Sequence, residues 1–367
     1  MLNNEYQMIE KIKKYEKTYI YGAGYVGKLV NKRFNYYNVK TNGFCVTEKN
    51  SLEDIVKKID EAEKEALIII AAKRPVCIEM EKNLVRKKFE HYEIVSERLI
   101  NVMERIERKG LRFQIHIVEH CNLKCRGCYH FSSLAKEEYT SVDEYKRDIN
   151  CLADLFQGKC EEILLLGGEP LLHPRLCEIL KISREAFHTG TIKILSNGTK
   201  LLLIGDEFFD ALRQYKIELW VTKYPIQFNY KKAEQRAKHL GVQIHYFNQE
   251  PVRSLGHQPL DITGQKDFKN NFYNCYRANE CIDLKHGRLF PCIIPAEIKP
   301  FCDYFNIQMD HSENNSMDIY VAQDAEQLLS AMEKPIPFCK YCNREDVALF
   351  GRSPWATTNY QISEWTE

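Results

Sequence analysis

The sequence has almost no net charge and no long apolar run. Its 52 Lys and Arg residues balance 51 Asp and Glu residues, which leaves a formal charge of +1. A surface that binds nucleic acid needs an excess of basic over acidic residues, and this sequence has almost none. A membrane helix requires a run of about 18 or more apolar residues, and the sequence contains none. We therefore expect neither nucleic acid nor membrane as a partner.

The first residues also lack the apolar core of a secretory signal, so we expect a cytoplasmic protein. The cytosol keeps thiols reduced, so the 14 cysteines are not expected to form a disulfide framework, and metal binding best explains the clustered ones. With 367 residues and 44% hydrophobic content, the chain is long enough for two or three domains.

A cluster of thiols follows the strand-like run of residues 112–118. Its members are Cys121, Cys125 and Cys128. Thiolates select zinc, copper(I) or iron-sulfur clusters. A structural zinc site uses four protein ligands, whereas a four-iron cluster held by three cysteines leaves one iron open to a substrate or cofactor. The alternatives are a zinc knuckle completed by His120 or His130 and a chance cluster in a chain with 14 cysteines.

Two later strand-like runs end in glycines and small polar residues. The first, residues 162–170, ends in Gly-Gly-Glu-Pro, and the second, residues 191–198, ends in Ser-Asn-Gly. Together with the C-x3-C-x2-C spacing, these motifs resemble the radical S-adenosylmethionine (radical SAM) superfamily. One departure is Gly127, which stands where the superfamily commonly has an aromatic residue; Tyr129 follows the third cysteine instead.

The resemblance implies an α/β fold, in which residues 109–255 form a partial (β/α)6 barrel with one four-iron cluster and S-adenosylmethionine. It implies that the cofactor lies against Gly167, Gly168, Glu169, Pro170, Ser196, Asn197 and Thr222, with Glu169 close to the methionine amino group. Reductive cleavage of the cofactor would then produce a 5'-deoxyadenosyl radical that takes a hydrogen atom from an unactivated carbon. A flavodoxin- or ferredoxin-type protein is the expected reductant.

Alternating patterns support the barrel independently. Helical spacing is present from a capping box at Ser141 to Phe156, from Pro174 to Phe187, and over residues 207–215 and 231–240. Strands are predicted at 163–166, 192–196, 217–222 and 242–247, and a parallel sheet holds its ligands at the strand C-termini. We therefore expect Lys223 and Tyr224 to face the thiol loop as candidate catalytic residues. A solvated loop charge is the alternative for Lys223.

Residues 1–108 form a separate predicted module. A short strand, the turn Gly22-x-Gly24-x-x-Gly27 and a helix start form the phosphate turn of a dinucleotide fold. Further strands are predicted at 39–46 and 66–72, but only Thr47-Glu48 loosely matches a ribose-binding acid. The module resembles Rossmann-like domains beside glycan enzymes. Two alternatives stay open: it binds a nucleotide or nucleotide sugar, or it serves only for docking. Residues 98–109 are the predicted linker.

Residues 256–367 contain a second thiol set, made up of Cys275, Cys292, Cys339 and Cys342. The set resembles the Twitch form of the SPASM extension, which implies a second, auxiliary four-iron cluster. A four-cysteine zinc ribbon is the alternative. Cys281 and Cys302 remain, and either could replace Cys275 as a ligand or lie free. The aromatic end of the chain, from Trp355 to Trp365, is expected to close over a substrate.

Three functions fit these patterns. The first is a radical SAM enzyme that oxidises or epimerises a sugar, nucleotide sugar or other glycan precursor, which the N-terminal module and the single auxiliary cluster favour. The second is an enzyme that modifies a peptide or protein. The third is a non-enzymatic iron-sulfur or zinc redox scaffold, against which the motifs at residues 167–170 and 196–198 argue.

Overall fold

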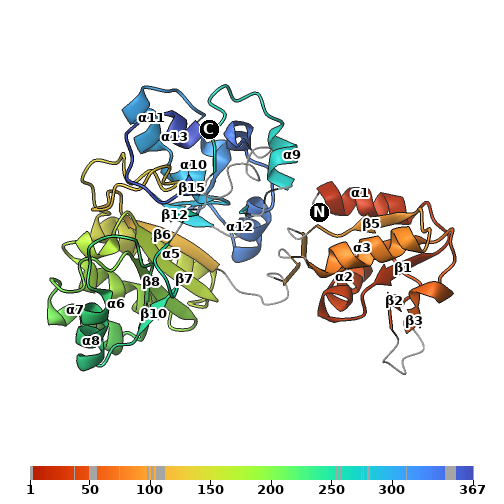
Figure 1. Ribbon diagram of the computed structural model, residues 1–367, viewed down its shortest axis with the longest axis horizontal. Helices are drawn as coiled ribbons and strands as arrows, with labels where there is room; N and C mark the ends of the chain where they lie inside the picture. Colours follow the sequence, from red (N-terminus) through yellow and green to blue (C-terminus); the bar gives the residue numbers. More distant parts are fainter. Residues whose placement is uncertain are drawn as a thin grey trace. The chain divides into compact units, whose positions relative to one another are not determined.

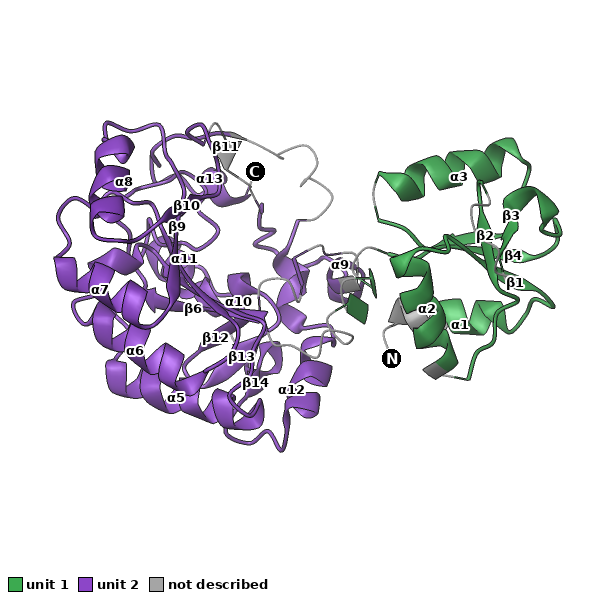
Figure 2. Ribbon diagram, turned by 90° about the horizontal axis from the view of Figure 1, so that it is seen from below, with its two compact units in different colours: residues 1–109 green, residues 110–367 purple. Residues whose placement is uncertain are grey.

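The computed structural model describes residues 3–366, apart from 37, 49–55, 74, 97–98, 101–102, 105–111, 253, 256–257, 274, 276, 279–281, 311 and 344–352. The chain divides into two compact units, Met1–Lys109 and Gly110–Glu367 (Figure 2). Most of the predicted linker, residues 98–109, lies outside the described residues.

The N-terminal unit is a parallel sheet with helices (Figure 1). Its strand order is β3-β2-β1-β4-β5. The strands are β1 (Thr18–Tyr21), β2 (Phe44–Val46), β3 (Val56–Lys58), β4 (Leu67–Ile70) and β5 (Tyr92–Ile94), and the helices are α1 (Asn3–Ile12), α2 (Tyr25–Tyr36), η1 (Ile59–Glu61) and α3 (Val76–Arg86). All residues of β1 and β4 are buried, as expected for parallel strands covered on both faces.

One predicted strand in this unit is shorter than its pattern indicated. We predicted a strand over residues 39–46, but β2 begins at Phe44. Gly43 has a φ of 110°, outside the strand region, and the Asn42 side chain accepts a hydrogen bond from the Thr18 backbone N–H at 2.8 Å. Backbone bonds to β1 continue before Phe44, from the Asn42 N–H to the Thr18 carbonyl at 2.8 Å and from the Ile20 N–H to the Gly43 carbonyl at 3.0 Å, but the backbone conformation of Gly43 interrupts the regular strand.

The C-terminal unit is organised around an eight-stranded sheet of order β10-β9-β8-β7-β6-β12-β13-β14. Five parallel strands come first, β6 (Arg112–Val118), β7 (Glu162–Gly167), β8 (Thr191–Ser196), β9 (Ile217–Val221) and β10 (Ile244–Tyr246). Four helices alternate with them, α5 (Val142–Leu155), α6 (Leu176–Ala186), α7 (Asp206–Gln214) and α8 (Tyr230–His239). The predicted α/β class with a parallel sheet is confirmed.

The sixth parallel strand lies at an unexpected edge. A (β/α)6 barrel would add it beside β10, but β12 (Asp283–Lys285) pairs in parallel with β6. An antiparallel extension follows through β13 (Arg288–Phe290) and β14 (Met317–Asp318).

A separate antiparallel pair joins β11 (Ser254–Leu255) to β15 (Ser353–Pro354). The remaining elements are η2 (Pro170–Leu172), α9 (Phe268–Tyr273), α10 (Ile293–Glu297), α11 (Lys299–Phe305), η3 (Glu313–Asn315), α12 (Ala325–Met332), η4 (Pro337–Tyr341) and α13 (Ser363–Thr366).

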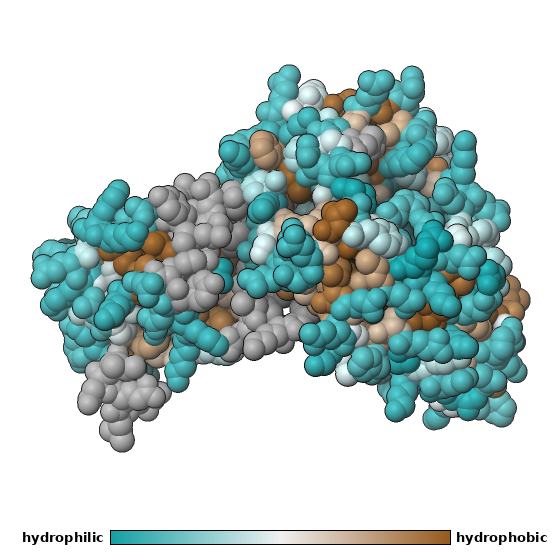
Figure 3. All heavy atoms as spheres, turned by 180° about the vertical axis from the view of Figure 1, so that it is seen from behind, coloured by the Kyte–Doolittle hydropathy of each residue, from teal (hydrophilic) through white to brown (hydrophobic). Residues whose placement is uncertain are grey.

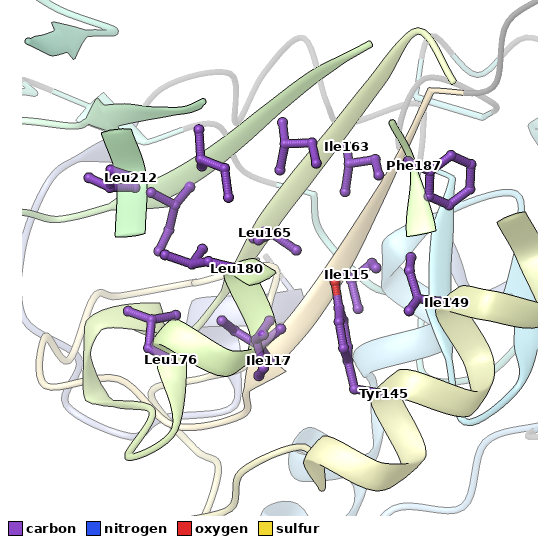
Figure 4. Packing of buried hydrophobic residues seen from close by; sticks show 14 of the residues in the cluster. Ile115, Ile117, Tyr145, Ile149, Ile163, Leu165, Leu176, Leu180, Phe187 and Leu212 are labelled. Carbon is purple, nitrogen blue, oxygen red and sulfur yellow. The ribbon is translucent and has the colours of Figure 1, made fainter. Parts of the chain in front are cut away.

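The two faces of this sheet pack against different parts of the chain. On one face, Ile115 and Ile117 of β6 pack with residues of α5 and α6 (Figure 4). On the other face, Leu164, Leu166 and Leu195 pack with buried aromatic residues of the C-terminal region. Because side chains alternate along a strand, residues of β6 between the two isoleucines point towards the C-terminal region.

The start of α5 differs from its predicted capping box. Ser141 is the N-cap residue, but its hydroxyl makes no capping hydrogen bond. Glu144 does not reach back to the cap, because its carboxylate pairs with His286 at 2.6 Å. Asp143 and Glu144 in the first turn still favour the positive end of the helix dipole.

Polar side chains cover most of the face in Figure 3, and apolar ones gather in smaller groups. Within the described part of the chain, no helix combines the length and apolar character that crossing a membrane requires.

Candidate functional site

The three clustered thiols lie on the loop that follows β6. Cys125 is buried, and Cys121 and Cys128 are half-buried. Nitrogen donors reach all three sulfurs: the Leu123 backbone N–H donates to Cys121 Sγ at 3.3 Å, the Trp355 indole N–H donates to Cys125 Sγ at 3.2 Å, and backbone N–H groups of residues 130–132 act on Cys128. Such bonds favour the sulfur in its negatively charged form.

Burial opposes that charged form. It raises the pKa of Cys125 to about 12, and it also raises the pKa of Cys121 and Cys128. A buried thiol of this kind ionises when a metal cation is bound to the sulfur. The donor set, with three soft sulfurs on one loop, therefore fits an iron-sulfur cluster.

The glycines that follow β7 allow two stretches of backbone to meet. Gly167 has a φ of 146°, and a Cβ added to it would lie 2.3 Å from the Val118 carbonyl oxygen. A Cβ at Gly168 would lie 1.9 Å from the carbonyl oxygen of His120. We predicted that these glycines let a ligand approach. The close approach in the structure is to the thiol loop itself.

Glu169 is fully buried where these backbones meet. Its Oε1 accepts hydrogen bonds from the Leu171 N–H at 3.0 Å and the Ser196 hydroxyl at 2.7 Å. Its Oε2 accepts one from the Asn197 N–H at 2.8 Å. Burial raises the pKa of Glu169 to about 7, although these bonds oppose the rise. A carboxylate can accept about four bonds, so one position on Oε2 remains for an ammonium group.

Asn197 connects this carboxylate to the thiol loop. Its side-chain N–H donates to Asn122 Oδ1 at 2.9 Å and lies 3.8 Å from Cys121 Sγ. Asn122 in turn donates to the Thr199 hydroxyl at 2.7 Å. The ends of β6, β7 and β8 are therefore joined by polar side chains. Pro170 begins η2 directly after Glu169.

The three residues predicted after β9 separate in space. The Thr222 backbone N–H donates to the Ser196 carbonyl at 3.0 Å. Tyr224 lies beside the thiols: burial raises its pKa well above the usual value, and all three thiols add to the rise. Lys223 does not share this position. Its ammonium donates to the Gln249 carbonyl at 3.0 Å and lies 4.0 Å from the Tyr246 ring centroid.

We predicted that Lys223 faces the thiols, but its side chain contacts Gln249 and Tyr246 instead. Lys223 follows the end of β9, and the Gln249 carbonyl of another segment accepts the hydrogen bond of its ammonium. The Tyr224 backbone N–H donates to the Tyr230 hydroxyl at 2.9 Å, and that hydroxyl donates to the Asn197 carbonyl at 3.3 Å. The sequence patterns did not identify Tyr230, since it lies at the start of α8 without a recognisable motif.

The aromatic end of the chain lies on the thiol loop. The Arg126 backbone N–H donates to the Ala356 carbonyl at 2.9 Å, and the Thr358 N–H donates to the Lys124 carbonyl at 2.7 Å. The Trp365 indole N–H donates to the Cys128 carbonyl at 3.0 Å. We predicted closure over a substrate, and the described contacts are instead with the loop that carries the thiols.

The second thiol set lies together in the C-terminal region. One cavity of about 20 Å³ is lined by Cys275, Cys292, Cys339 and Cys342. The Asn271 side chain fixes the loop of the last two by donating to the Cys339 carbonyl at 2.8 Å and the Cys342 carbonyl at 2.7 Å. Burial and the other three thiols raise the pKa of Cys339 well above its usual value. Four soft donors around one small space fit a saturated cluster.

The structure tests only one of the two cysteines that could replace Cys275, namely Cys302. Cys302 is buried in α11 and is absent from the residues that line the cavity. Cys281 lies outside the described residues.

The glycine turn of the N-terminal unit has open space at one position. A Cβ at Gly24 would meet no heavy atom of the described residues within 4 Å, whereas a Cβ at Gly27 would lie 1.7 Å from the Gly22 carbonyl oxygen. Gly22 has a φ of 117°. Gly22 and Gly27 therefore shape the turn, and Gly24 leaves space above the start of α2.

Comparisons with known proteins agree with the thiol-loop geometry. The family model described as the radical SAM superfamily matches residues 115–226. The antilisterial bacteriocin subtilosin biosynthesis protein AlbA of Bacillus subtilis (strain 168) is 32% identical over 111 residues, which are 30% of this chain and 23% of AlbA. These matches support membership of the radical SAM superfamily.

A second relative is GTP 3',8-cyclase 1 of Mycobacterium tuberculosis (strain CDC 1551 / Oshkosh), which is 28% identical over 112 residues, 29% of this chain and 30% of the cyclase. The match thus spans less than a third of each relative. A crystal structure of BtrN in complex with AdoMet and 2-DOIA aligns with 64% of this chain and 92% of its own, at 15% identity and a TM-score of 0.39.

Gly168→Ala tests the backbone contact between the thiol loop and the end of β7. The new methyl group would meet the His120 carbonyl, so we expect the free energy of unfolding to fall by about 1–3 kcal/mol. The midpoint of thermal unfolding should fall with it. Gly24→Ala is the matched control, because the same methyl group enters open space there. Equal midpoints for the two variants would contradict the contact.

Proposed function

We propose that this radical SAM enzyme uses two four-iron clusters to abstract hydrogen from a sugar, nucleotide sugar or other glycan precursor. The proposed outcome is oxidation (dehydrogenation) or epimerisation. The observation that carries the proposal is the presence of two thiol sets, three sulfurs on the loop after β6 and four around one cavity. Three ligands leave an iron open to S-adenosylmethionine, whereas four ligands saturate a cluster.

The two sites support different tasks. When bound, the open cluster and S-adenosylmethionine supply a radical that takes hydrogen from carbon. Glu169 would hold the cofactor's ammonium group through the free position on Oε2. Tyr224, buried beside the thiols, would help to exclude water. A saturated auxiliary cluster has no open iron, so electron transfer is its proposed task, with a flavodoxin- or ferredoxin-type protein as the external reductant.

The N-terminal unit supports a substrate that carries a nucleotide. Its glycine turn lies at the start of α2, where backbone N–H groups can bind phosphate, and the space at Gly24 is open. The similarity to a GTP cyclase agrees with a nucleotide-bearing substrate. The second candidate is peptide modification, which the similarity to a bacteriocin biosynthesis protein favours. Incubating the reduced enzyme with candidate sugars or peptides, and measuring 5'-deoxyadenosine, separates the two.

The iron content tests the two-cluster proposal. We expect the anaerobically reconstituted protein to hold about eight irons and eight sulfides per chain. Replacing Cys121, Cys125 and Cys128 with alanine should lower the count to about four and abolish cleavage of S-adenosylmethionine. Replacing Cys302 is the control and should leave both values unchanged. About four irons with bound zinc in the unchanged protein would contradict two clusters.

Glu169→Gln tests the proposed cofactor contact. A charge-assisted bond contributes about 1.5–3 kcal/mol, so we expect S-adenosylmethionine to bind roughly ten- to a hundredfold more weakly, measured by equilibrium dialysis. Glu178→Gln, which removes an exposed carboxylate on α6, is the matched control. The assignment fails if both variants bind the cofactor as tightly as the unchanged protein.

Gly24→Val tests the nucleotide proposal. The branched side chain would fill the open space of the glycine turn, so nucleotide-sugar binding measured by calorimetry should be lost while cleavage of S-adenosylmethionine continues. If the unchanged protein binds no nucleotide, nucleotide sugar or NAD(H) at millimolar concentration, the N-terminal unit is a docking domain. The carbohydrate proposal then loses its main support.

A further inference from the structure

A group of buried polar side chains lies between β6, β12 and α10. His116 comes from β6, Asp283 from β12 and Glu297 from α10. Because Ile115 and Ile117 face the helices (Figure 4), His116 points to the opposite face of the sheet. One ligand atom from each side chain can be chosen so that all three lie within 4.8 Å of one another.

These side chains are buried without the partners that buried polar groups need. His116 is 3% exposed, and Asp283 and Glu297 are 0% exposed. Among the described residues, both carboxylate oxygens of Asp283 and the Oε1 of Glu297 have no partner with full hydrogen-bond geometry, although the Gln114 side chain lies close enough to Asp283 to lower its pKa. Burying an ionised carboxylate without a partner costs on the order of several kcal/mol of stability. These oxygen atoms therefore require a nearby positive charge or a bound proton.

The neighbouring charges do not balance. The Lys285 ammonium donates to Glu119 Oε2 at 2.9 Å and to Glu297 Oε2 at 2.5 Å. This ammonium therefore contacts two carboxylates, and the third, Asp283, receives only its longer-range attraction. Burial, and then the nearby Glu297, raise the pKa of Asp283 well above its usual value. If all three carboxylates ionise, the site carries two negative charges in excess.

The histidine has one nitrogen directed towards the carboxylates. His116 Nε2 lies 2.8 Å from His130 Nδ1, and His116 Nδ1 lies 3.2 Å from Glu297 Oε2. The second contact does not have hydrogen-bond geometry. Burial lowers the pKa of His116 to about 3, so the ring is neutral at pH 7. A histidine ligand commonly donates its other N–H to a partner, and His130 can accept here.

We propose that His116 Nδ1, Asp283 and Glu297 bind one divalent transition-metal ion. One imidazole with two carboxylates suits zinc, manganese or iron(II). Ligand atoms about 2.0–2.2 Å from a metal lie about 3.3–3.6 Å apart in a tetrahedral site and at most about 4.4 Å apart when they are opposite each other, so atoms separated by up to 4.8 Å would need to close by roughly 0.4–1.5 Å. The ion neutralises the two excess charges and coordinates the orphaned oxygens.

The ion would join the C-terminal region to the barrel. In the described residues, β12 and β6 share a single register pair, Asp283 with Gln114. One pair is a weak connection between two parts of a sheet. A metal held by β6, β12 and α10 would fix this junction, and it is distinct from both thiol sets.

Manganese(II) is the probe, because it prefers oxygen and nitrogen ligands and competes little for thiolates. The full chain with its clusters is treated with EDTA and titrated with Mn²⁺, and free Mn²⁺ is followed by electron paramagnetic resonance. We expect one bound equivalent and a rise in the thermal midpoint. The Asp283→Asn variant should bind Mn²⁺ at least tenfold more weakly, and its thermal midpoint should not rise when Mn²⁺ is added. Its amide replaces the charge with a group of similar shape.

Asp148→Asn is the matched control. Asp148 is also buried, but its carboxylate already accepts bonds from the Gly287 N–H and the Tyr320 hydroxyl. This variant should bind Mn²⁺ as the unchanged protein does. The proposal is overturned if the unchanged protein binds no Mn²⁺ and its midpoint does not respond to the ion. It is also overturned if Asp283→Asn binds like the control, and in that case Asp283 is buried as the protonated acid.

Discussion

The contact between the backbones at the ends of β6 and β7 is the constraint on which the candidate site depends. The Gly168 N–H donates to the Val118 carbonyl at 2.7 Å, and the Glu169 N–H donates to the His120 carbonyl at 3.1 Å. These two bonds fix the start of the thiol loop against the segment that carries Glu169. Any side chain at Gly168 would separate them, since its Cβ would overlap the His120 carbonyl. The position of the first thiol relative to the buried carboxylate therefore depends on a residue that has no side chain.

The two faces of the sheet in the C-terminal unit have different roles: one contributes apolar packing, and the other carries polar side chains. The helix-facing side of β6 is apolar and packs with α5 and α6, where burial of each large aliphatic side chain contributes about 1.5–3 kcal/mol. The other side faces the C-terminal region and carries His116 among charged partners. The strand ends add Glu169 and Asn197. Polar groups are thus placed on a rigid apolar layer, which holds them in dry surroundings where charge interactions are strong.

Much of this arrangement could be predicted from local patterns. Helices α5 to α8 begin and end within a residue or two of their predicted limits, because each has a regular apolar face. The thiol loop and the strand-end motifs were found because their residues are close in sequence. The capping box at Ser141 was wrong because Glu144 pairs with His286, which lies 142 positions further along the chain. Local rules contain no information about such a distant competitor.

The same limit explains which site residues were missed and which was misplaced. Tyr230 was missed, and Trp355 was predicted to close over a substrate but donates to a sulfur of the thiol loop. Both act from distant parts of the sequence, so no spacing rule places them. Lys223 was expected beside the thiols because it follows a strand, but a bond to the Gln249 carbonyl takes its ammonium elsewhere. The sequence patterns did not identify the buried group at His116. Its carboxylate partners come from β12 and α10, beyond the reach of any motif.

Contacts between residues distant in sequence also bring the last described residues of the chain to the thiol loop. Trp355 donates to the Cys125 sulfur, and Trp365 donates to the Cys128 carbonyl. Hydrogen bonds to cluster sulfurs and exclusion of solvent are two of the factors that set the reduction potential of an iron-sulfur cluster. The terminal segment supplies both at the three-thiol loop. Its aromatic residues therefore belong to the environment of that loop, and the electronic properties of a cluster bound there would depend on residues more than 200 positions away in sequence.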